Sequence, residues 1–251
     1  VNYFFMAGGA TFYVNNVGLI AGLSDANITD CTISDGEIVL GGSNKTTITN
    51  MGLVTGTLHS HEISNCNVSG TLQTNGSNQV TNMGGIAGCK LSSNVATISS
   101  CDVEPIFYQT SVATTAYRGG VVGVLVDSSA SLTIDNTTVT YNSSSIDFNG
   151  TNFGGMVAKN NGAILNINYG TVNFSTSSVF GSTFTSGSTG KDIAGFVNVL
   201  TGSTSKISKL YRCRFTGYGI NNVSVVDDFG GFIGKSSNYY ILEECINNAS
   251  Y

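Results

Sequence analysis

Charged side chains are scarce in this chain of 251 residues, in which Asp, Glu, Lys and Arg together make up 10%. Ordinary soluble domains contain about 25%, so the polar surface must come from Ser, Thr and Asn, which suits the cell exterior. Only ten residues are Lys or Arg, and they do not cluster. With a net charge of −5, the chain has no electrostatic basis for binding nucleic acid or inserting into an anionic membrane.

Proline, tryptophan and long apolar runs are also rare or missing. The chain has one proline and no tryptophan, and no apolar run reaches the roughly 18 residues that a transmembrane helix needs. Ala, Leu, Glu and Lys are too sparse for capped amphipathic helices. Yet 41% of the residues are hydrophobic and 32 are glycine, which predicts a large core and many tight bends or close backbone contacts.

A glycine motif recurs seven times along the chain. It reads TNMGGIAG at residues 81–88 and returns at 15–22, 49–56, 116–123, 151–158, 191–198 and 227–234. A period of 32 to 40 residues indicates a solenoid or an array. A phosphate-binding loop would occur once and lead into a helix, so no nucleotide site is expected. The structural glycines of the repeat are Gly18, Gly52, Gly84, Gly119, Gly154, Gly195 and Gly230, with Ala194 at the first glycine position of the sixth copy.

A second element follows each glycine motif, as in HEISNCNVS at residues 61–69. Its alternating polar and β-branched residues predict a short strand with one buried side, and its extra residue predicts a bend. A more variable third run fills each period. The sequence thus predicts an all-β fold, a parallel β-helix (β-solenoid) of seven repeats of about 35 residues, each one three-stranded turn, spanning 1–251 as a single domain. A propeller is the alternative, although its blades need four strands.

Two ladders of side chains are expected inside the solenoid. Glycines would permit positive φ at a sharp corner and let successive turns approach. The residues after them should point inward, namely Leu19, Leu53, Ile86, Val121, Met156, Phe196 and Phe232. A cysteine ladder comprises Cys31, Cys66, Cys101, Cys213 and Cys245, with Asn136 and either Tyr169 or Gly170 at this position in the fourth and fifth repeats. Buried thiols pack as small hydrophobes, while disulfides between neighbouring turns or between Cys89 and Cys101 remain open.

The pairing of a G-G-apolar-apolar-G motif with I-x-N-C-x-V-x-G, clearest in residues 51–88, resembles the GLUG-motif repeats of large adhesins and cell-surface proteins. The resemblance covers nearly the whole chain and is closest in the first three repeats, whereas the fourth and fifth lack the cysteine. It implies a parallel β-helix stalk, a surface or adhesive role, and no catalytic residues.

Residues that could perform chemistry are few and scattered. His59 and His61 have a spacing that can hold a metal, but no third ligand and no C-x2–4-C pair accompany them. Asp227 and Asp228 suit either a calcium ligand or a solvated turn, of which we favour the turn. No paired carboxylates or nucleophile elbow are recognisable, and the threonines form no regular ice-binding array. We expect no enzyme, cofactor or metal; a polysaccharide-acting β-helix enzyme is a minor alternative.

Ten Asn-X-Ser/Thr acceptors spread along the chain predict an N-glycosylated protein that is extracellular or on the cell surface. They are Asn27, Asn44, Asn67, Asn75, Asn136, Asn142, Asn149, Asn173, Asn222 and Asn248.

The repeat also runs up to both ends of the sequence. The first residue is Val1 rather than Met, so we expect a processed product or an excised segment. A second copy placed after the chain would continue the period, and neither end reads as a polar cap. We therefore expect a unit of a head-to-tail filament, made of separate subunits or tandem copies, with glycans coating its sides. The alternative is a stalk or ligand-binding segment of a large adhesin capped by other domains.

Overall fold

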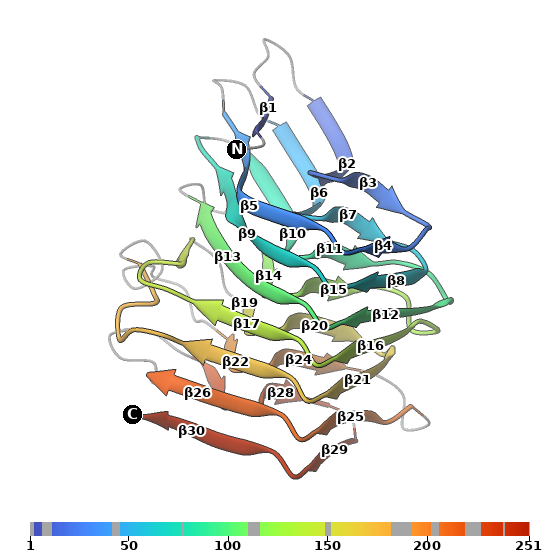
Figure 1. The fold of residues 1–251 in the computed structure, drawn as a ribbon, viewed down its shortest axis with the longest axis vertical. Coiled ribbons are helices and arrows are strands. Elements are labelled where there is room, and N and C mark those ends of the chain that lie inside the picture. Colours follow the sequence, from blue (N-terminus) through green and yellow to red (C-terminus); the bar gives the residue numbers. More distant parts are fainter. Residues whose placement is uncertain are drawn as a thin grey trace.

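A computed structural model describes residues 3–6, 12–41, 46–76, 78–109, 116–148, 152–181, 192–201, 206–218, 227–237 and 239–250. Within these residues every regular element is a strand, and all strand pairs are parallel and stack along one axis (Figure 1). No helix in the described part is long and apolar enough to cross a membrane.

The strands form four sheets, here called A to D. Sheet A contains β1 (Tyr3–Met6), β5 (Thr32–Leu40), β9 (Asn67–Thr74), β13 (Asp102–Gln109), β17 (Thr138–Tyr141), β22 (Thr171–Phe174), β26 (Arg214–Tyr218) and β30 (Ile246–Ser250), with β18 (Ile146–Phe148) paired to β13. Sheet B contains β2 (Phe12–Gly18), β6 (Thr46–Gly52), β10 (Gln79–Gly84), β14 (Tyr117–Gly119), β19 (Asn152–Gly154), β23 (Asp192–Ala194) and β27 (Asp228–Gly230).

The other two sheets follow in chain order. Sheet C contains β3 (Ala21–Ser24), β7 (Thr55–Leu58), β11 (Ala87–Lys90), β15 (Val122–Leu125), β20 (Val157–Asn161), β24 (Val197–Thr201) and β28 (Ile233–Ser236). Sheet D contains β4 (Ile28–Thr29), β8 (His61–Ser64), β12 (Val95–Ser99), β16 (Ser131–Asp135), β21 (Ile164–Asn168), β25 (Ser208–Tyr211) and β29 (Tyr240–Glu243).

Each repeat forms one coil, which visits sheets B, C, D and A in that order. The predicted parallel β-solenoid with one turn per repeat is therefore confirmed. Each coil has four strands rather than the expected three. The glycine motif separates a strand of sheet B from one of sheet C, and the bend in the second element separates a strand of sheet D from one of sheet A. Repeats pair in register, so Gly84 lies between Gly52 and Gly119.

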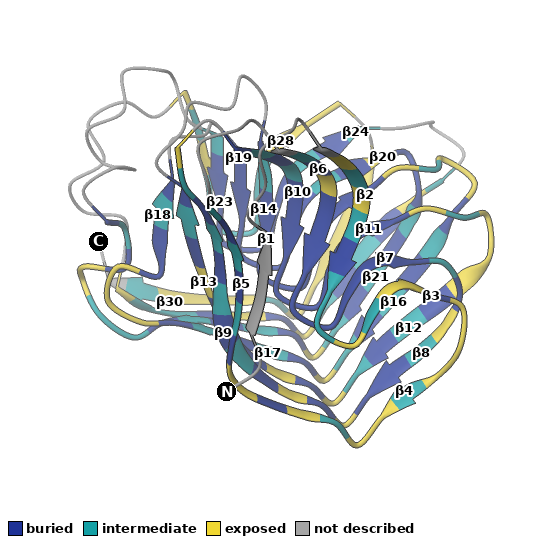
Figure 2. Ribbon diagram, turned by 90° about the horizontal axis from the view of Figure 1, so that it is seen from above, coloured by how far each residue is buried: buried dark blue, intermediate teal, exposed yellow. Residues whose placement is uncertain are grey.

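Sheets A and D meet at one corner and form an outer V, and sheets B and C turn inward between its arms (Figure 2). The glycine motif makes this possible by allowing close approach. A Cβ on Gly84 would lie 1.9 Å from the carbonyl oxygen of Ala87, and one on Gly88 would lie 2.4 Å from the backbone nitrogen of Met51 in the preceding coil. The expected positive φ is not observed at any described glycine of the motif. Ala194 pairs with Gly154 and Gly230, so Gly195 occupies the second glycine position.

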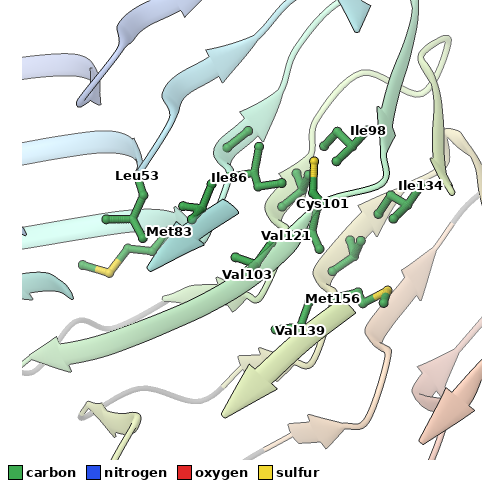
Figure 3. Packing of buried hydrophobic residues seen from close by; sticks show 14 of the residues in the cluster. Leu53, Met83, Ile86, Ile98, Cys101, Val103, Val121, Ile134, Val139 and Met156 are labelled. Carbon is green, nitrogen blue, oxygen red and sulfur yellow. The ribbon is translucent and has the colours of Figure 1, made fainter. Parts of the chain in front are cut away.

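The apolar ladder runs through the inner turn between sheets B and C (Figure 3). Ile86, Val121 and Met156 are fully buried, and backbone hydrogen bonds of 3.0 and 2.9 Å join them in successive coils. The first two coils differ from the prediction by one residue. The amide of Val54 donates to the carbonyl of Ile86, so Ile20 and Val54 belong to this ladder. Leu19 and Leu53 take the place of the second glycine of later coils. Leu19 reaches Gly36 of sheet A, where an added Cβ would lie 2.6 Å from its Cδ1.

The bend between sheets D and A contains a non-glycine residue in the left-handed conformation in all seven coils, with φ from 44° to 56°. Such a conformation costs roughly 1 kcal/mol or more for a residue with a side chain. Hydrogen bonds between coils offset this cost, as from the amide of Asn65 to the carbonyl of Ser99 at 3.1 Å. These residues are Asp30, Asn65, Ser100, Asn136, Tyr169, Arg212 and Glu244.

This bend corrects the predicted register of the middle repeats. The residue after the left-handed one is the cysteine position, because Asp102 pairs with Thr138 and Thr138 pairs with Thr171. Thr137, and not Asn136, therefore continues the cysteine ladder in the fourth coil, and Gly170 continues it in the fifth.

Candidate functional site

The acceptor asparagines among the described residues lie on or beside sheets A and D. Asn67, Asn173 and Asn248 are in strands of sheet A, and Asn142 follows β17 of the same sheet. The others in the described part are Asn75 directly after β9, Asn27 directly before β4, and Asn136 in the bend between sheets D and A. No acceptor among the described residues lies in a strand of sheet B or C; Asn44, Asn149 and Asn222 lie outside the described residues.

The described acceptors differ in accessibility. Asn27, Asn67, Asn136, Asn142 and Asn248 are exposed, whereas Asn75 and Asn173 are half-buried. The Asn173 side-chain oxygen also accepts a hydrogen bond from the Thr216 hydroxyl at 3.2 Å. An exposed amide is the form that a glycosylating enzyme can reach, so Asn173 is a less accessible acceptor than Asn67 in the same sheet.

The outer face of sheet A is hollowed across the first four coils. One hollow of about 400 Å³ is lined by Asn67, Asp102, Glu104 and Thr138, among others. A second of about 510 Å³ adjoins it, sharing Glu104 and including Asn142. The walls combine hydroxyls, amides and carboxylates, so this groove is a polar surface that presents two acceptor asparagines.

The six cysteines are free thiols. The ladder thiols donate to the carbonyl two residues back, as Cys66 does to Ser64 at 3.2 Å, and the Thr137 hydroxyl makes the same contact with Asp135 at 3.0 Å. Burial raises the pKa of the Cys101 thiol to about 12, so this thiol is neutral and a poor nucleophile or metal ligand. Cys89 lies apart from the ladder in sheet C, 3.3 Å from the Thr57 hydroxyl.

The structure brings a third polar side chain to the two histidines. Nδ1 of His59 and Nδ1 of His61 lie 3.4 and 3.5 Å from Oδ1 of Asp25, which also accepts a hydrogen bond from Ser60. The hydrogen bonds from Ser60 and His59 lower the pKa of Asp25. The His59 contact is a hydrogen bond, whereas Nδ1 of His61 is hydrogen-bonded to the Ser60 hydroxyl. The described residues contain no group of three or more His, Cys, Asp or Glu side chains with the geometry of a metal site.

Asp228 is the first residue of β27, and its Oδ2 lies 3.1 Å from Nζ of Lys235. Its register neighbour in the sixth coil is Asp192. Burial, followed by the negative charge of Asp228, raises the pKa of Asp192. This stack of two carboxylates has a lysine as its observed counter-ion.

A buried arginine was not foreseen from the sequence. Arg118 is fully buried; its guanidinium donates to the carbonyls of Val80 and Thr81 at 3.0 and 3.1 Å and to the side-chain oxygen of Gln109, and it lies 5.2 Å from the ring centre of Phe148. Burial lowers the pKa of this arginine to about 9. Only its place in an otherwise apolar column could have identified it.

Both ends of the solenoid expose apolar side chains and strand edges. Phe229 and Leu242 in the seventh coil are 41% and 44% exposed, whereas their neighbours in the sixth coil, Ile193 and Leu210, are fully buried. At the other end, Ile20 is 46% exposed. In the described part, β27 to β30 and β2 to β4 each pair with a strand on one side only. The terminal coils thus expose side chains and strand edges that are buried and paired in the inner coils.

Comparison with family models, curated proteins and solved structures finds no match to this chain.

Proposed function

We propose that this chain is a structural extracellular glycoprotein whose solenoids stack end to end into a filament. The observation that carries the proposal is the composition of the terminal coils. Phe229 and Leu242 occupy columns that are fully buried one coil further in, and all four sheets offer open strand edges beside them. Open edges next to apolar side chains favour the addition of further strands, and a second copy offers an edge of the same cross-section.

The position of the acceptors supports the glycoprotein part of the proposal. The described acceptors lie on sheets A and D and on the bend between them, and all but Asn27 and Asn248 belong to coils away from the edges that would join copies. Glycans attached there would keep the outer faces hydrated and block side-by-side association, while the ends stay free. The extracellular setting agrees with the low charge and with the resemblance to surface repeats.

Cryo-electron microscopy of the secreted protein tests this function. Seven coils spaced by about 4.8 Å predict filaments with an axial repeat of about 34 Å, with extra density at Asn27, Asn67 and Asn142. Leu242→Lys, which puts a charge on the open end, should abolish the filaments. The matched control Thr171→Lys puts the same charge on the side of sheet A and should leave them intact. A chain that stays monomeric at high concentration would contradict the filament.

The hollowed face of sheet A favours a second candidate, a stalk or ligand-binding segment of a large adhesin. The groove spans several coils and is lined by polar side chains, which suits an extended polar ligand. The longer reading frame separates the two functions: further near-identical units support the filament, and different flanking domains support the adhesin.

A further inference from the structure

The cysteine ladder ends in a half-buried thiol at each end of the solenoid. Cys31 belongs to the first coil and Cys245 to the seventh, whereas Cys66, Cys101 and Cys213 between them are buried. Neighbours in one column are separated by the strand spacing of about 4.8 Å, which lies within the Cα separations of about 4.4–6.8 Å that a disulfide can span. A copy that continued the solenoid without a gap would bring its Cys31 next to Cys245.

The open edges of sheet A have complementary extents. β1 pairs with only the second half of β5, from Glu37 to Leu40. Among the described residues, no strand pairs with Thr32 or Ile33 on that side of β5. β30 begins in the column of Thr32, because Ile246 pairs with Arg214 and the same column runs back through sheet A. β30 of one copy would therefore cover the part of β5 that β1 leaves unpaired. Its last residue, Ser250, would reach the column of Glu37, where β1 of the next copy begins. The two strands lie at opposite ends of sheet A (Figure 1).

The inner turn matches across the same junction. Gly230 lies in the column of Gly18, so a glycine would meet a glycine at the tightest bend of the coil. Phe229 would cover Val17, and Phe232 would cover the exposed Ile20. The same kind of contact is present between the sixth and seventh coils, where the rings of Phe196 and Phe232 pack with their centres 5.1 Å apart.

One pair in this register is unfavourable. Glu244 occupies the left-handed position of the seventh coil and Asp30 that of the first, so the junction brings two carboxylates together. Both residues are exposed, and salt screens exposed charges. Glu244 is moreover already paired with Arg212, whose Nε lies 2.5 Å from its Oε2, so this pair adds little repulsion at the junction.

We propose that copies join in one register, with Cys245 of one copy stacked on Cys31 of the next and with β30 and β1 sharing one row of sheet A. This inference rests on the proposed filament and adds to it the identity of the residues at the junction. Since Cys31 and Cys245 of the same chain are six coils apart, a bond between them must join two copies.

The test uses a variant that keeps only these two thiols. Cys66→Thr, Cys101→Thr and Cys213→Thr introduce the residue that the chain itself has at Thr137, and Cys89→Thr copies its register neighbour Thr57. Diamide is added at high salt; it takes two electrons and two protons from each pair of thiols as the disulfide forms. We expect a ladder of covalent multimers on a non-reducing gel. Two controls that add Cys31→Ser or Cys245→Ser should give no ladder.

The other outcomes distinguish a failure of this register from a failure of the proposed filament. Filaments without a ladder would overturn the register and leave the filament standing, whereas neither filaments nor a ladder would remove both. Dimers formed by the control that retains only Cys245 would indicate back-to-back contact and overturn the register. If the variant does not fold, mass spectrometry of the oxidised wild-type chain must find the peptide that links Cys31 to Cys245, and its absence from oxidised filaments would refute the proposal.

Discussion

The inner turn between sheets B and C provides the sharpest test of the fold, through the third glycine of the motif. An alanine Cβ at position 88 would lie 2.4 Å from the backbone nitrogen of Met51, a separation at which a real Cβ is essentially never found. Because both groups belong to backbone, neither can turn away, and strand β11 must move off strand β6. Gly22 has the same place in the first coil, where the nearest contact of an added Cβ is 3.3 Å, to the carbonyl oxygen of Asn16.

The magnitude follows from two opposing terms. Overpacking a filled site costs about 1–3 kcal/mol, and a clash with backbone belongs at the upper end. Replacing glycine by alanine returns about 0.4–1 kcal/mol by restricting the unfolded chain. We therefore expect Gly88→Ala to lower the free energy of unfolding by about 2 kcal/mol, which is about 4–8 °C in melting temperature for a chain of this size. Gly22→Ala should stay within about 0.5 kcal/mol of the parent.

Circular dichroism melts and hydrogen exchange together provide the assay. Solenoids can open coil by coil, so exchange must show that the loss is concentrated in the second and third coils. Equal stability of Gly88→Ala and the parent chain, or an equal loss in Gly22→Ala, would refute the argument from close backbone contact. Ala158 and Asn198 occupy this position in the fifth and sixth coils, so the backbone there accommodates a Cβ and Ala158→Gly is expected to bring no gain.

Three further predictions concern single side chains. Arg118→Met copies Met83 from the same column and should raise the free energy of unfolding at pH 7 by about 1 kcal/mol because it removes a buried charge. Urea denaturation measures this, with Arg214→Met at an exposed position as control. A lower free energy of unfolding would show that the hydrogen bonds of Arg118 stabilise the fold by more than the burial of its charge costs. Asp192→Asn should stabilise the chain by about 0.5 kcal/mol at pH 7. The pKa of Asp192 is raised in the folded state, which therefore disfavours the charged carboxylate, and wild-type stability falls as pH rises through that pKa. The gain from the substitution should vanish at a pH below the pKa of the unfolded carboxyl. In protein secreted from eukaryotic cells, glycopeptide mass spectrometry should find higher occupancy at Asn67, which is exposed, than at Asn173, which is half-buried and hydrogen-bonded to Thr216; the reverse order would show that side-chain exposure does not govern modification.

The period of the sequence predicted the coils because a solenoid stacks the equivalent residues of successive repeats on one another. A glycine that recurs every 32 to 40 residues has the same structural role in every copy. The register through Gly52, Gly84 and Gly119 could therefore be predicted from the sequence. The cysteine position was equally clear where cysteine is present. In the fourth repeat, which has no cysteine, the position was assigned one residue too early, at Asn136. Backbone conformation decides the matter, since Asn136 has a positive φ of 44° and Thr137 makes the hydrogen bond of the cysteines.

The number of strands per coil was not predictable by the same reasoning. A single residue in the left-handed conformation divides one polar–apolar alternation into strands of two different sheets, and that residue varies from Asp30 to Tyr169 to Arg212. No residue type marks it, because the hydrogen bonds between coils impose the conformation on whatever is there. Likewise, the approach of Asp25 to His59 and His61 depends on stacking residues more than thirty positions apart in sequence, which local patterns do not report.

Parallel strands also determine what kind of assembly the ends can make. Within the solenoid every strand runs in the direction of its neighbours, so the edge that β30 presents differs from the edge that β5 presents beside β1. Two copies that met through like ends would have to pair their strands antiparallel and would give up the stacking of equal columns, including glycine on glycine at the inner turn. Contact between unlike ends preserves those columns and leaves one free end of each kind after every addition. A heterologous contact of this sort without a closing rotation produces an open filament rather than a closed dimer, and therefore the parallel topology, together with the exposed apolar columns of the terminal coils, favours growth along one axis.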